Sequence, residues 1–228
     1  MLTWWWQSLG RTLPLSAAWP LVPLGAIADT APLSGRVLPV YYAGMDVPHY
    51  WTADQVQRLL DALASHNRHQ ARTAALIMWR TGLRVSEVLE LEWRDLDYAG
   101  EPATLLVRRS KTRRARTVRL HPELVQLFTN WPANRSPRDK VVAIGMRTAL
   151  RHISDGIRWA DLDEESPGTG KRRPGAHSLR HSAARHWLMV GRIPLNVVSA
   201  WLGHANVQVT LRIYLPIVGS DHGMENVP

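Results

Sequence analysis

The feature of the sequence that most restricts its possible folds is a long series of segments with helical periodicity, interrupted once. Apolar residues recur at helical spacing through most of the chain after residue 50. The segments with this pattern are 55–65, 70–82, 83–93, 123–131, 146–160, 178–191, 194–203 and 206–214. The interruption consists of two short apolar or β-branched runs, ATLLVRR and RTVRL, on either side of the basic stretch SKTRRA. It predicts a β-hairpin, to which DLDY at 95–98 can add a third strand.

Several helix ends carry recognisable signals. Thr52 and Gln55 have the pattern of a capping box, so a helix is expected to begin near residue 53. Gly82 and Gly203 follow apolar segments and are typical of the residue just after a helix. Ser86 is the candidate N-cap of the helix that follows Gly82. Together with the hairpin, these signals predict a mainly α domain with a small antiparallel β-sheet, an α+β fold.

Residues 1–50 differ from the rest of the chain. They hold six of the 15 prolines, the run Trp4-Trp5-Trp6, and equal numbers of basic and acidic residues. We expect a separate Pro- and Trp-rich segment, poorly ordered or loosely packed on residues 51–228, which carry the whole net charge of +9. A signal peptide is the alternative, because LVPLGAIADTA contains a small-residue step. No basic cluster precedes that step, however, and prolines interrupt the apolar part.

The charge and the cysteine content restrict the partners and the chemistry. A surplus of +9 favours a polyanionic partner, with nucleic acid as the first candidate and an anionic membrane surface as the second. No apolar run approaches the ~20 residues that span a bilayer, so no membrane-embedded part is expected. The absence of cysteine excludes disulfides, thiolate metal sites and a cysteine nucleophile, and it suits the reducing cytoplasm.

The stretch GAHSLRHSAARHW at 175–187 concentrates three histidines and two arginines. His177 and His181 are four residues apart and could bind a metal, but the zinc-protease pattern needs a glutamate that H-S-L-R-H lacks. A structural helix is the simplest interpretation of the histidines, and His181 and His186 are expected to be structural or DNA-facing. Arg180, however, is costly to bury without an anion. A phosphate is therefore the third interpretation.

Three further segments decide between these interpretations: TGLRVSE at 81–87, RRSKTRRAR at 108–116 and AWLGHANVQVTLRIY at 200–214. Each alone is a common pattern. Together and in this order they resemble the catalytic domain of the tyrosine recombinase (phage integrase) family. The matching positions are Arg84, Lys111, His177, Arg180, His204 and Tyr214. The resemblance assigns 51–216 to that catalytic domain and leaves 217–228 as a C-terminal tail, whereas the N-terminal segment does not look like the family's DNA-clamping domain.

The resemblance implies a reaction that needs neither a metal nor a cofactor. A tyrosine attacks a DNA phosphorus, giving a 3′-phosphotyrosine and a free 5′-hydroxyl. Tyr214 is then the nucleophile, and Lys111 is the general acid that protonates the leaving 5′-oxygen. Arg84 and Arg180 would bind the non-bridging phosphate oxygens, a task that suits planar and permanently charged guanidinium groups.

The remaining candidates have less certain roles within the same resemblance. His177 is a candidate base or phosphate hydrogen-bond donor and His204 a second phosphate donor, and the sequence does not distinguish these roles. Glu87 either orients Arg84 or is an ordinary first-turn glutamate favoured by the helix dipole. The hairpin arginines, expected to meet flanking DNA phosphates, are Arg113, Arg114 and Arg116.

The function implied is that of a site-specific DNA recombinase or integrase. It would act on double-stranded DNA as a homo-tetramer, with accessory DNA-bending or directionality factors, in the cytoplasm and without a membrane. One alternative is DNA relaxation of the type IB topoisomerase kind, which uses a similar residue set. The other is a truncated integrase that binds DNA without catalysis. The L-G-H sequence with a closely following tyrosine favours the recombinase.

Overall fold

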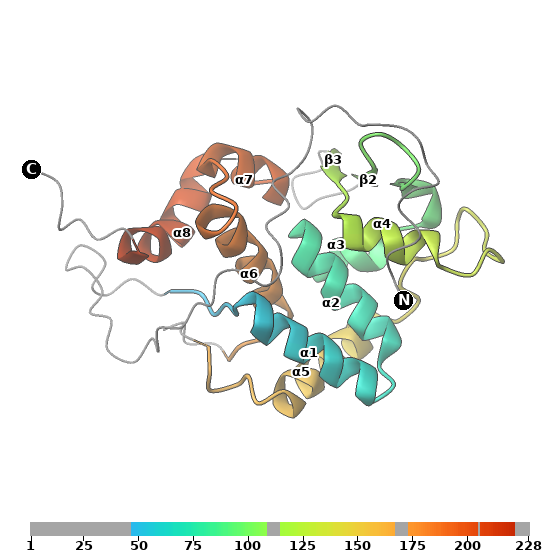
Figure 1. Ribbon diagram of the computed structural model, residues 1–228, viewed down its shortest axis with the longest axis horizontal. Coiled ribbons are helices and arrows are strands. Elements are labelled where there is room, and N and C mark those ends of the chain that lie inside the picture. Colours follow the sequence, from blue (N-terminus) through green and yellow to red (C-terminus); the bar gives the residue numbers. More distant parts are fainter. Residues whose placement is uncertain (1–46, 109–114, 167–172, 205, 222–228) are drawn as a thin grey trace, which may run out of the picture. The chain divides into compact units, whose positions relative to one another are not determined.

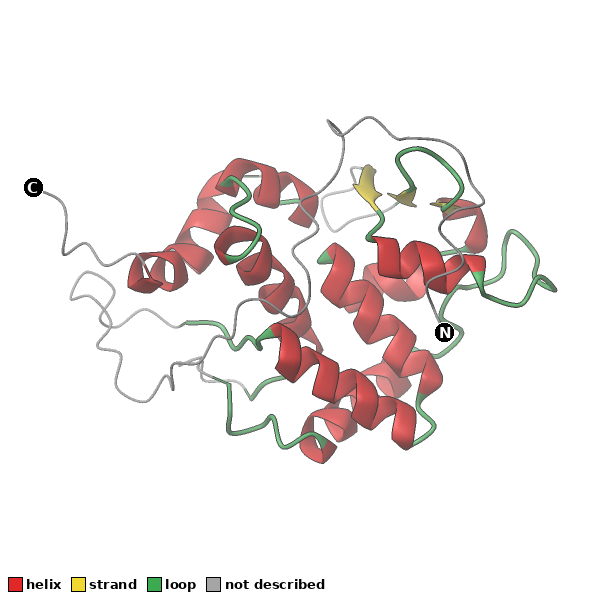
Figure 2. Cartoon of the chain, viewed as in Figure 1, coloured by secondary structure: helices red, strands yellow, loops and turns green. Residues whose placement is uncertain are grey.

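The computed structural model describes residues 47–108, 115–166, 173–204 and 206–221, all within one compact unit, Arg36–Pro228. Helices make up most of this part of the chain, and three strands form one small sheet (Figure 2). The elements in chain order (Figure 1) are α1 (Ala53–Ser65), α2 (His69–Thr81), α3 (Val85–Glu90), the 3₁₀ turn η2 (Trp93–Asp95), β1 (Leu96–Asp97), β2 (Thr104–Val107), β3 (Arg116–Arg119), α4 (Pro122–Thr129), α5 (Met146–Trp159), α6 (Ala176–Met189), α7 (Leu195–Leu202) and α8 (Val207–Asp221). The predicted α+β class is confirmed.

The sheet has the order β1-β2-β3 and is antiparallel throughout. Leu105 of β2 faces Leu96 of β1 on one side and Val118 of β3 on the other, and all three are buried. Leu106 points the other way and is exposed, as the two-residue period of a strand requires. The predicted hairpin and the third strand at DLDY are thus both confirmed, whereas the basic loop 109–114 lies outside the described residues.

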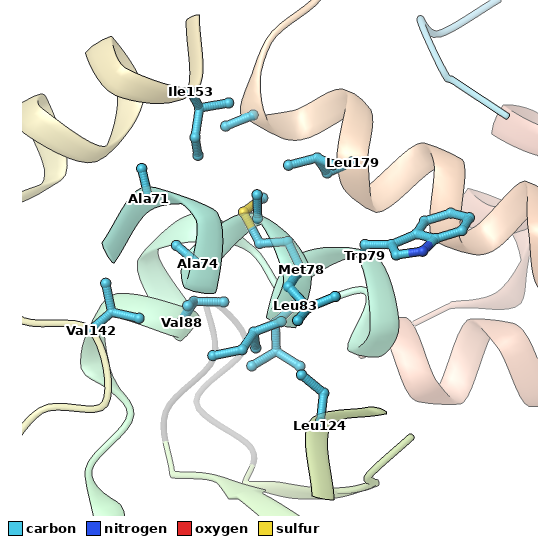
Figure 3. Close-up of a cluster of buried hydrophobic side chains, with 14 of the residues drawn as sticks. Ala71, Ala74, Met78, Trp79, Leu83, Val88, Leu124, Val142, Ile153 and Leu179 are labelled. Carbon is cyan, nitrogen blue, oxygen red and sulfur yellow. The ribbon is translucent and has the colours of Figure 1, made fainter. Parts of the chain in front are cut away.

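The core is built around α2, which is buried along almost its whole length. Ala71, Ala74 and Ala75 are small enough for neighbouring helices to approach closely, and α1, α5 and α6 all contact this helix. Figure 3 shows α2 surrounded by Ile153 of α5 and Leu179 of α6, with Leu124 of α4 below. This helix ends at Gly82 in the left-handed conformation (φ 64°), as predicted, so the chain turns directly into the segment that carries Arg84.

Two predicted helix boundaries were wrong. The N-cap of α3 is Arg84 and not Ser86, because the Glu87 carboxylate accepts a hydrogen bond from the Arg84 backbone N–H (2.9 Å) and starts the helix two residues earlier. At the other end of the chain, the helix predicted to end at Tyr214 continues to Asp221 as α8. The capping box of Thr52 and Gln55 is confirmed.

The residues just before α1 are not separate from the domain. The backbone N–H of Trp51 donates to the Ser182 hydroxyl in α6 (2.8 Å), and the Trp51 ring is buried. Val47 and Tyr50 are buried in a second apolar cluster together with Tyr214. The end of the segment that was expected to be loosely packed therefore forms one wall around the candidate nucleophile, while residues 1–46 lie outside the described part of the chain.

Candidate active site at the junction of α3, β3, α6 and α8

Arg180 is the centre of the site. It lies on α6 and is 2% exposed, and its guanidinium donates to two backbone carbonyls, Gly82 (2.6 Å) and Leu202 (2.7 Å). Its Nη2 also lies 3.0 Å from Nε2 of His204. Burial, and after it the nearby charge of Arg84, lower the pKa of Arg180 to about 10, so the group remains charged at neutral pH. Within the described residues its hydrogen bonds thus go to carbonyls and a histidine, and the positive charge has no carboxylate in ion-pair contact.

Arg84 reaches the site from the N-terminus of α3. Its Nη1 lies 3.2 Å from Oε1 of Glu87, and about a quarter of its side chain (26%) is exposed. Glu87 is almost fully buried, with 4% of its side chain exposed. Burial alone raises the pKa of Glu87, but hydrogen bonds and charges from Arg116 and Arg84 outweigh it and hold the pKa below its usual value. Glu87 thus contacts the Arg84 side chain and also caps the first turn of α3, so both interpretations of this glutamate stay open.

His204 follows the left-handed Gly203 that ends α7. Because an arginine nitrogen can only donate, Nε2 of His204 accepts from Arg180, and its Nδ1–H donates to Thr210 (2.7 Å). Burial and the charge of Arg180 lower the pKa of His204 to about 4, so it is neutral at pH 7. Thr210 was not predicted from the sequence, although it lies one helical turn before Tyr214 on the same buried face of α8.

Tyr214 is buried and does not reach the surface. It is 1% exposed and lies in an apolar cluster with Ala184, Val198 and Leu202. Burial raises the pKa of its phenol well above the usual value, and the charge of Arg180 offsets this only in part. A phenol of this kind is a poor nucleophile until its surroundings change.

The phenol oxygen of Tyr214 lies 2.9 Å from Nδ1 of His181, a contact that sequence analysis missed. His181 was expected to be structural or DNA-facing. Burial, and then the neighbouring His177, lower its pKa to about 3, so the ring is neutral at pH 7. No spacing rule pointed to this pair, because 33 residues separate the partners and only the packing of α8 on α6 joins them.

His177 stands one turn before His181 at the start of α6, and the two rings meet edge to face at 4.8 Å. The residue is exposed, but its ring lies close enough to the site that partial burial and the charges of Arg180 and Arg84 lower its pKa. It is therefore a neutral and accessible imidazole at pH 7.

The hairpin residues are only partly described. Lys111, Arg113 and Arg114 lie in the loop 109–114, outside the described residues, and they remain predictions. Arg116 is described as the first residue of β3, and only 12% of its side chain is exposed. Its guanidinium contacts Glu87 inside the site, whereas the sequence predicted a contact with a flanking DNA phosphate.

The described residues also bear on other kinds of site. Among them, no group of three or more His, Asp or Glu side chains is arranged to hold a metal ion. No helix of this part of the chain is long and apolar enough to cross a membrane.

The chain is similar to known proteins over most of the described residues. The profile described as the phage integrase family matches residues 49–217. A tyrosine recombinase from Thermosipho africanus is 28% identical over 77% of this chain and 59% of its own length. Tyrosine recombinase XerA from Pyrococcus furiosus is 29% identical over 72% of this chain and 56% of its own length. The chain thus spans less than two thirds of these relatives.

A solved structure shares the fold. The XerH site-specific recombinase, bound to its difH substrate in a pre-cleavage complex, superimposes with a TM-score of 0.56. The match covers 75% of this chain and 50% of the XerH chain at 23% identity.

Proposed function

Because the chain belongs to the phage integrase family, we propose that it is a site-specific DNA recombinase that cleaves and rejoins strands through a 3′-phosphotyrosine. The observation that carries this proposal is the surplus of positive charge inside the site. Among the described residues, Arg84, Arg116 and Arg180 lie around a single carboxylate, Glu87. Three cations and one anion leave a net charge of two, in a partly buried place where uncompensated charge is costly. A phosphate diester is an anion suited to neutralise it.

The arginines would act on the transition state. When the phenol oxygen of Tyr214 attacks phosphorus, negative charge grows on the non-bridging oxygens, and guanidinium groups already in place stabilise it. Losing one such preorganised donor typically costs ~3–4 kcal/mol of barrier. Arg180 is well suited because two carbonyl contacts hold it rigidly before DNA arrives.

The leaving group needs a proton. As the bond between phosphorus and the 5′-oxygen breaks, Lys111 in the hairpin loop would protonate that oxygen. Nearby arginines lower the pKa of such a lysine and make it a better acid. Rejoining is the reverse: a 5′-hydroxyl attacks the phosphotyrosine and the phenol leaves. The bond energy stays in the phosphotyrosine, so the reaction requires neither a cofactor nor a metal.

The histidines would serve the phosphate and the phenol. His177 is neutral and exposed, which suits a base or a hydrogen-bond donor to a phosphate oxygen. His204 accepts from Arg180 in the free protein, so its Nε2 can donate to a phosphate after the ring changes tautomer, with the Thr210 hydroxyl then donating to Nδ1, or after the ring is protonated. A phosphate bound at Arg180 would favour that protonation by raising the pKa of His204.

The partners follow from the mechanism. Strand exchange joins two duplexes, and we propose a homo-tetramer assembled on double-stranded DNA, with accessory DNA-bending or directionality factors. We place the reaction in the cytoplasm, where chromosomal DNA is accessible.

The test is covalent capture from a DNA library. Duplexes with a randomised centre and a nick in that centre trap a recombinase, because the short fragment with the free 5′-hydroxyl diffuses away and prevents rejoining. We expect a covalent adduct, a narrow set of recovered sequences, and strand exchange between two recovered duplexes. Capture without exchange would favour the topoisomerase alternative. Binding without capture would favour the non-catalytic one.

A further inference from the structure

The guanidinium of Arg116 donates to three oxygen atoms of the protein. Its Nη1 and Nη2 donate to the two oxygens of Glu87 at 3.0 and 2.8 Å, and its Nε donates to the carbonyl of Trp201 at 3.2 Å. This is a bidentate arginine–carboxylate pair, the strongest form of charge-assisted hydrogen bond. The guanidinium is therefore directed inward from β3, although the residue belongs to the basic stretch that was expected to contact DNA.

The carboxylate of Glu87 is saturated by two arginines. Its Oε1 accepts from Nη1 of Arg84 and Nη1 of Arg116, and its Oε2 accepts from the Arg84 backbone N–H and Nη2 of Arg116. A carboxylate offers about four acceptor positions, so none remains. Arg116 occupies two of them, and Arg84 can place only one side-chain nitrogen on Glu87.

Arg116 also contacts the turn that carries His204. Gly203 has a positive φ of 68°, and a Cβ added there would lie 3.0 Å from the guanidinium carbon of Arg116. The guanidinium of Arg116 therefore joins three segments. It extends from β3, it contacts the start of α3 through Glu87, and it contacts the end of α7 through the Trp201 carbonyl. β3 follows the loop that contains Lys111. Arg84 directly precedes α3, and His204 follows the end of α7.

We propose that Arg116 is a positioning residue of the cleavage site and not a DNA-phosphate contact. By occupying half of the Glu87 acceptor positions, it prevents Arg84 from closing on both carboxylate oxygens and leaves that guanidinium available to the scissile phosphate. Without Arg116, Glu87 and Arg84 form their own bidentate pair, and Arg84 turns away from the DNA. This inference rests on the proposed strand-cleavage function.

A dependence on pH follows. The charged groups that face Glu87 are Arg84 from α3, Arg116 from β3 and Arg180 from α6. Burial alone raises the pKa of Glu87, and Arg116 makes the largest opposing contribution. Removing Arg116 therefore raises that pKa. In the variant the carboxylate is the form that turns Arg84 away from the DNA, so protonation of Glu87 releases Arg84 and part of the lost cleavage rate returns as the pH falls.

The test compares Arg116→Lys with Arg119→Ala. Lysine retains the charge but cannot form the bidentate pair, and Arg119 is an exposed arginine on the same strand. The probe is a nicked duplex recovered by the covalent capture, with wild type as the positive control. For Arg116→Lys we expect wild-type affinity and salt dependence, cleavage of bound DNA at least about tenfold slower at neutral pH, and a defect that becomes smaller as the pH falls. We expect Arg119→Ala to cleave at the wild-type rate.

A double variant adds a second measurement. Since both residues act through one carboxylate, Arg116→Lys with Glu87→Gln should be no slower than the slower single variant, and its defect should no longer become smaller as the pH falls. Wild-type cleavage by Arg116→Lys, or multiplying effects in the double variant, would overturn the inference and assign Arg116 to a phosphate. No adduct with the wild type would instead refute the proposed function itself.

Discussion

At the scale of single residues, the free protein keeps its reactive groups in contact with one another. His181 contacts the phenol of Tyr214, Arg180 donates to His204, and Glu87 holds Arg84. Each contact satisfies a polar group in a buried place where an unpaired one would cost about 1–3 kcal/mol. In the proposed reaction, DNA binding would replace several of these contacts with contacts to phosphate, and the energy difference between the two sets would determine how readily cleavage begins.

The first prediction concerns the nucleophile. Tyr214→Phe removes only the phenol oxygen and its contact with His181, so the apolar cluster stays filled. We expect no covalent DNA adduct and nearly unchanged affinity for duplex DNA, measured by denaturing gel and by fluorescence anisotropy. The matched control is Tyr50→Phe, in the same cluster, which should still form the adduct. An adduct in Tyr214→Phe that maps to another tyrosine would refute the assignment.

The second prediction separates Lys111 from its basic neighbours. A substrate whose bridging 5′-oxygen is replaced by sulfur has a better leaving group and needs little general acid. Lys111→Ala should therefore cleave normal DNA poorly, by a factor of about 10²–10⁴, and recover most of its rate on the sulfur substrate. Arg180→Ala should not recover, because it serves the non-bridging oxygens.

The control for Lys111 is Arg113→Ala. If Arg113 contacts a flanking phosphate, this variant should bind more weakly and lose about one unit of salt-dependence slope, with no sulfur rescue. Identical behaviour of the two variants, both without rescue, would mean that Lys111 contributes only electrostatics.

At the scale of elements, α6 is the platform of the site. It carries His177, Arg180 and His181 within little more than one turn, and it contacts α2, α7 and α8. These contacts come from both sides, because α2 belongs to the main core and α8 carries Tyr214. A change in the packing of α8 on α6 therefore moves the nucleophile relative to a fixed arginine.

The third prediction tests the packing of α1 on α5. A Cβ at Gly156 would lie 2.7 Å from Cδ2 of Leu63 and 2.9 Å from Cδ1 of Leu59, and both leucines are fully buried. Alanine would add up to about 1 kcal/mol of helix propensity. The clash, at about 1–3 kcal/mol, exceeds that gain because the leucines have no free space to move into.

We therefore expect Gly156→Ala to lower the free energy of unfolding, measured in urea. The control is Gly145→Ser at the N-cap of α5, where a Cβ would meet nothing within 4 Å. Serine there should stabilise the protein by a few tenths, roughly 0.3 kcal/mol. Increased stability in Gly156→Ala would show that the two helices can separate without cost.

At the scale of the whole molecule, several histidines are kept neutral by burial next to arginines. The pKa of His121, which caps α4 through its Nδ1, is lowered to about 4 by burial and the charge of Arg80. Those of His181 and His204 are lowered to about 3 and about 4, in each case first by burial. The unfolded chain can protonate these histidines at a higher pH than the folded chain can, so the free energy of unfolding falls in acid.

The fourth prediction is this acid dependence. The unfolded chain binds protons at these histidines near pH 6.5, and the folded chain binds them only near pH 4 or below. Their stabilising contribution is thus complete above about pH 6.5 and declines as the pH falls towards 4, by up to roughly 2 kcal/mol per histidine at pH 5. Urea denaturation at pH 7 and pH 5 measures it. His121→Asn keeps a capping group without a titration, so its stability should fall less steeply.

Local sequence was sufficient for most elements, and it supplied the candidate site residues. Capping boxes, helix-ending glycines and hydrophobic periods act over three to seven residues, so Thr52, Gly82 and the hairpin were predicted correctly. The order of motifs identified Arg84, Arg180, His204 and Tyr214, and the first three of these lie together as expected. These features depend on neighbours along the chain, which a sequence displays directly.

The tertiary structure alone decided which partner each polar group has. Arg116 contacts Glu87 across 29 residues, and His181 contacts Tyr214 across 33 residues. No local signal encodes either pair, because each depends on how β3 lies against α3 or how α8 packs on α6. From the sequence, Arg116 is one basic residue among several and is predicted to contact DNA; only the packing of β3 shows that its side chain is directed inward. The sequence likewise contains no sign that Tyr214, the proposed nucleophile, is buried, and only the fold shows it.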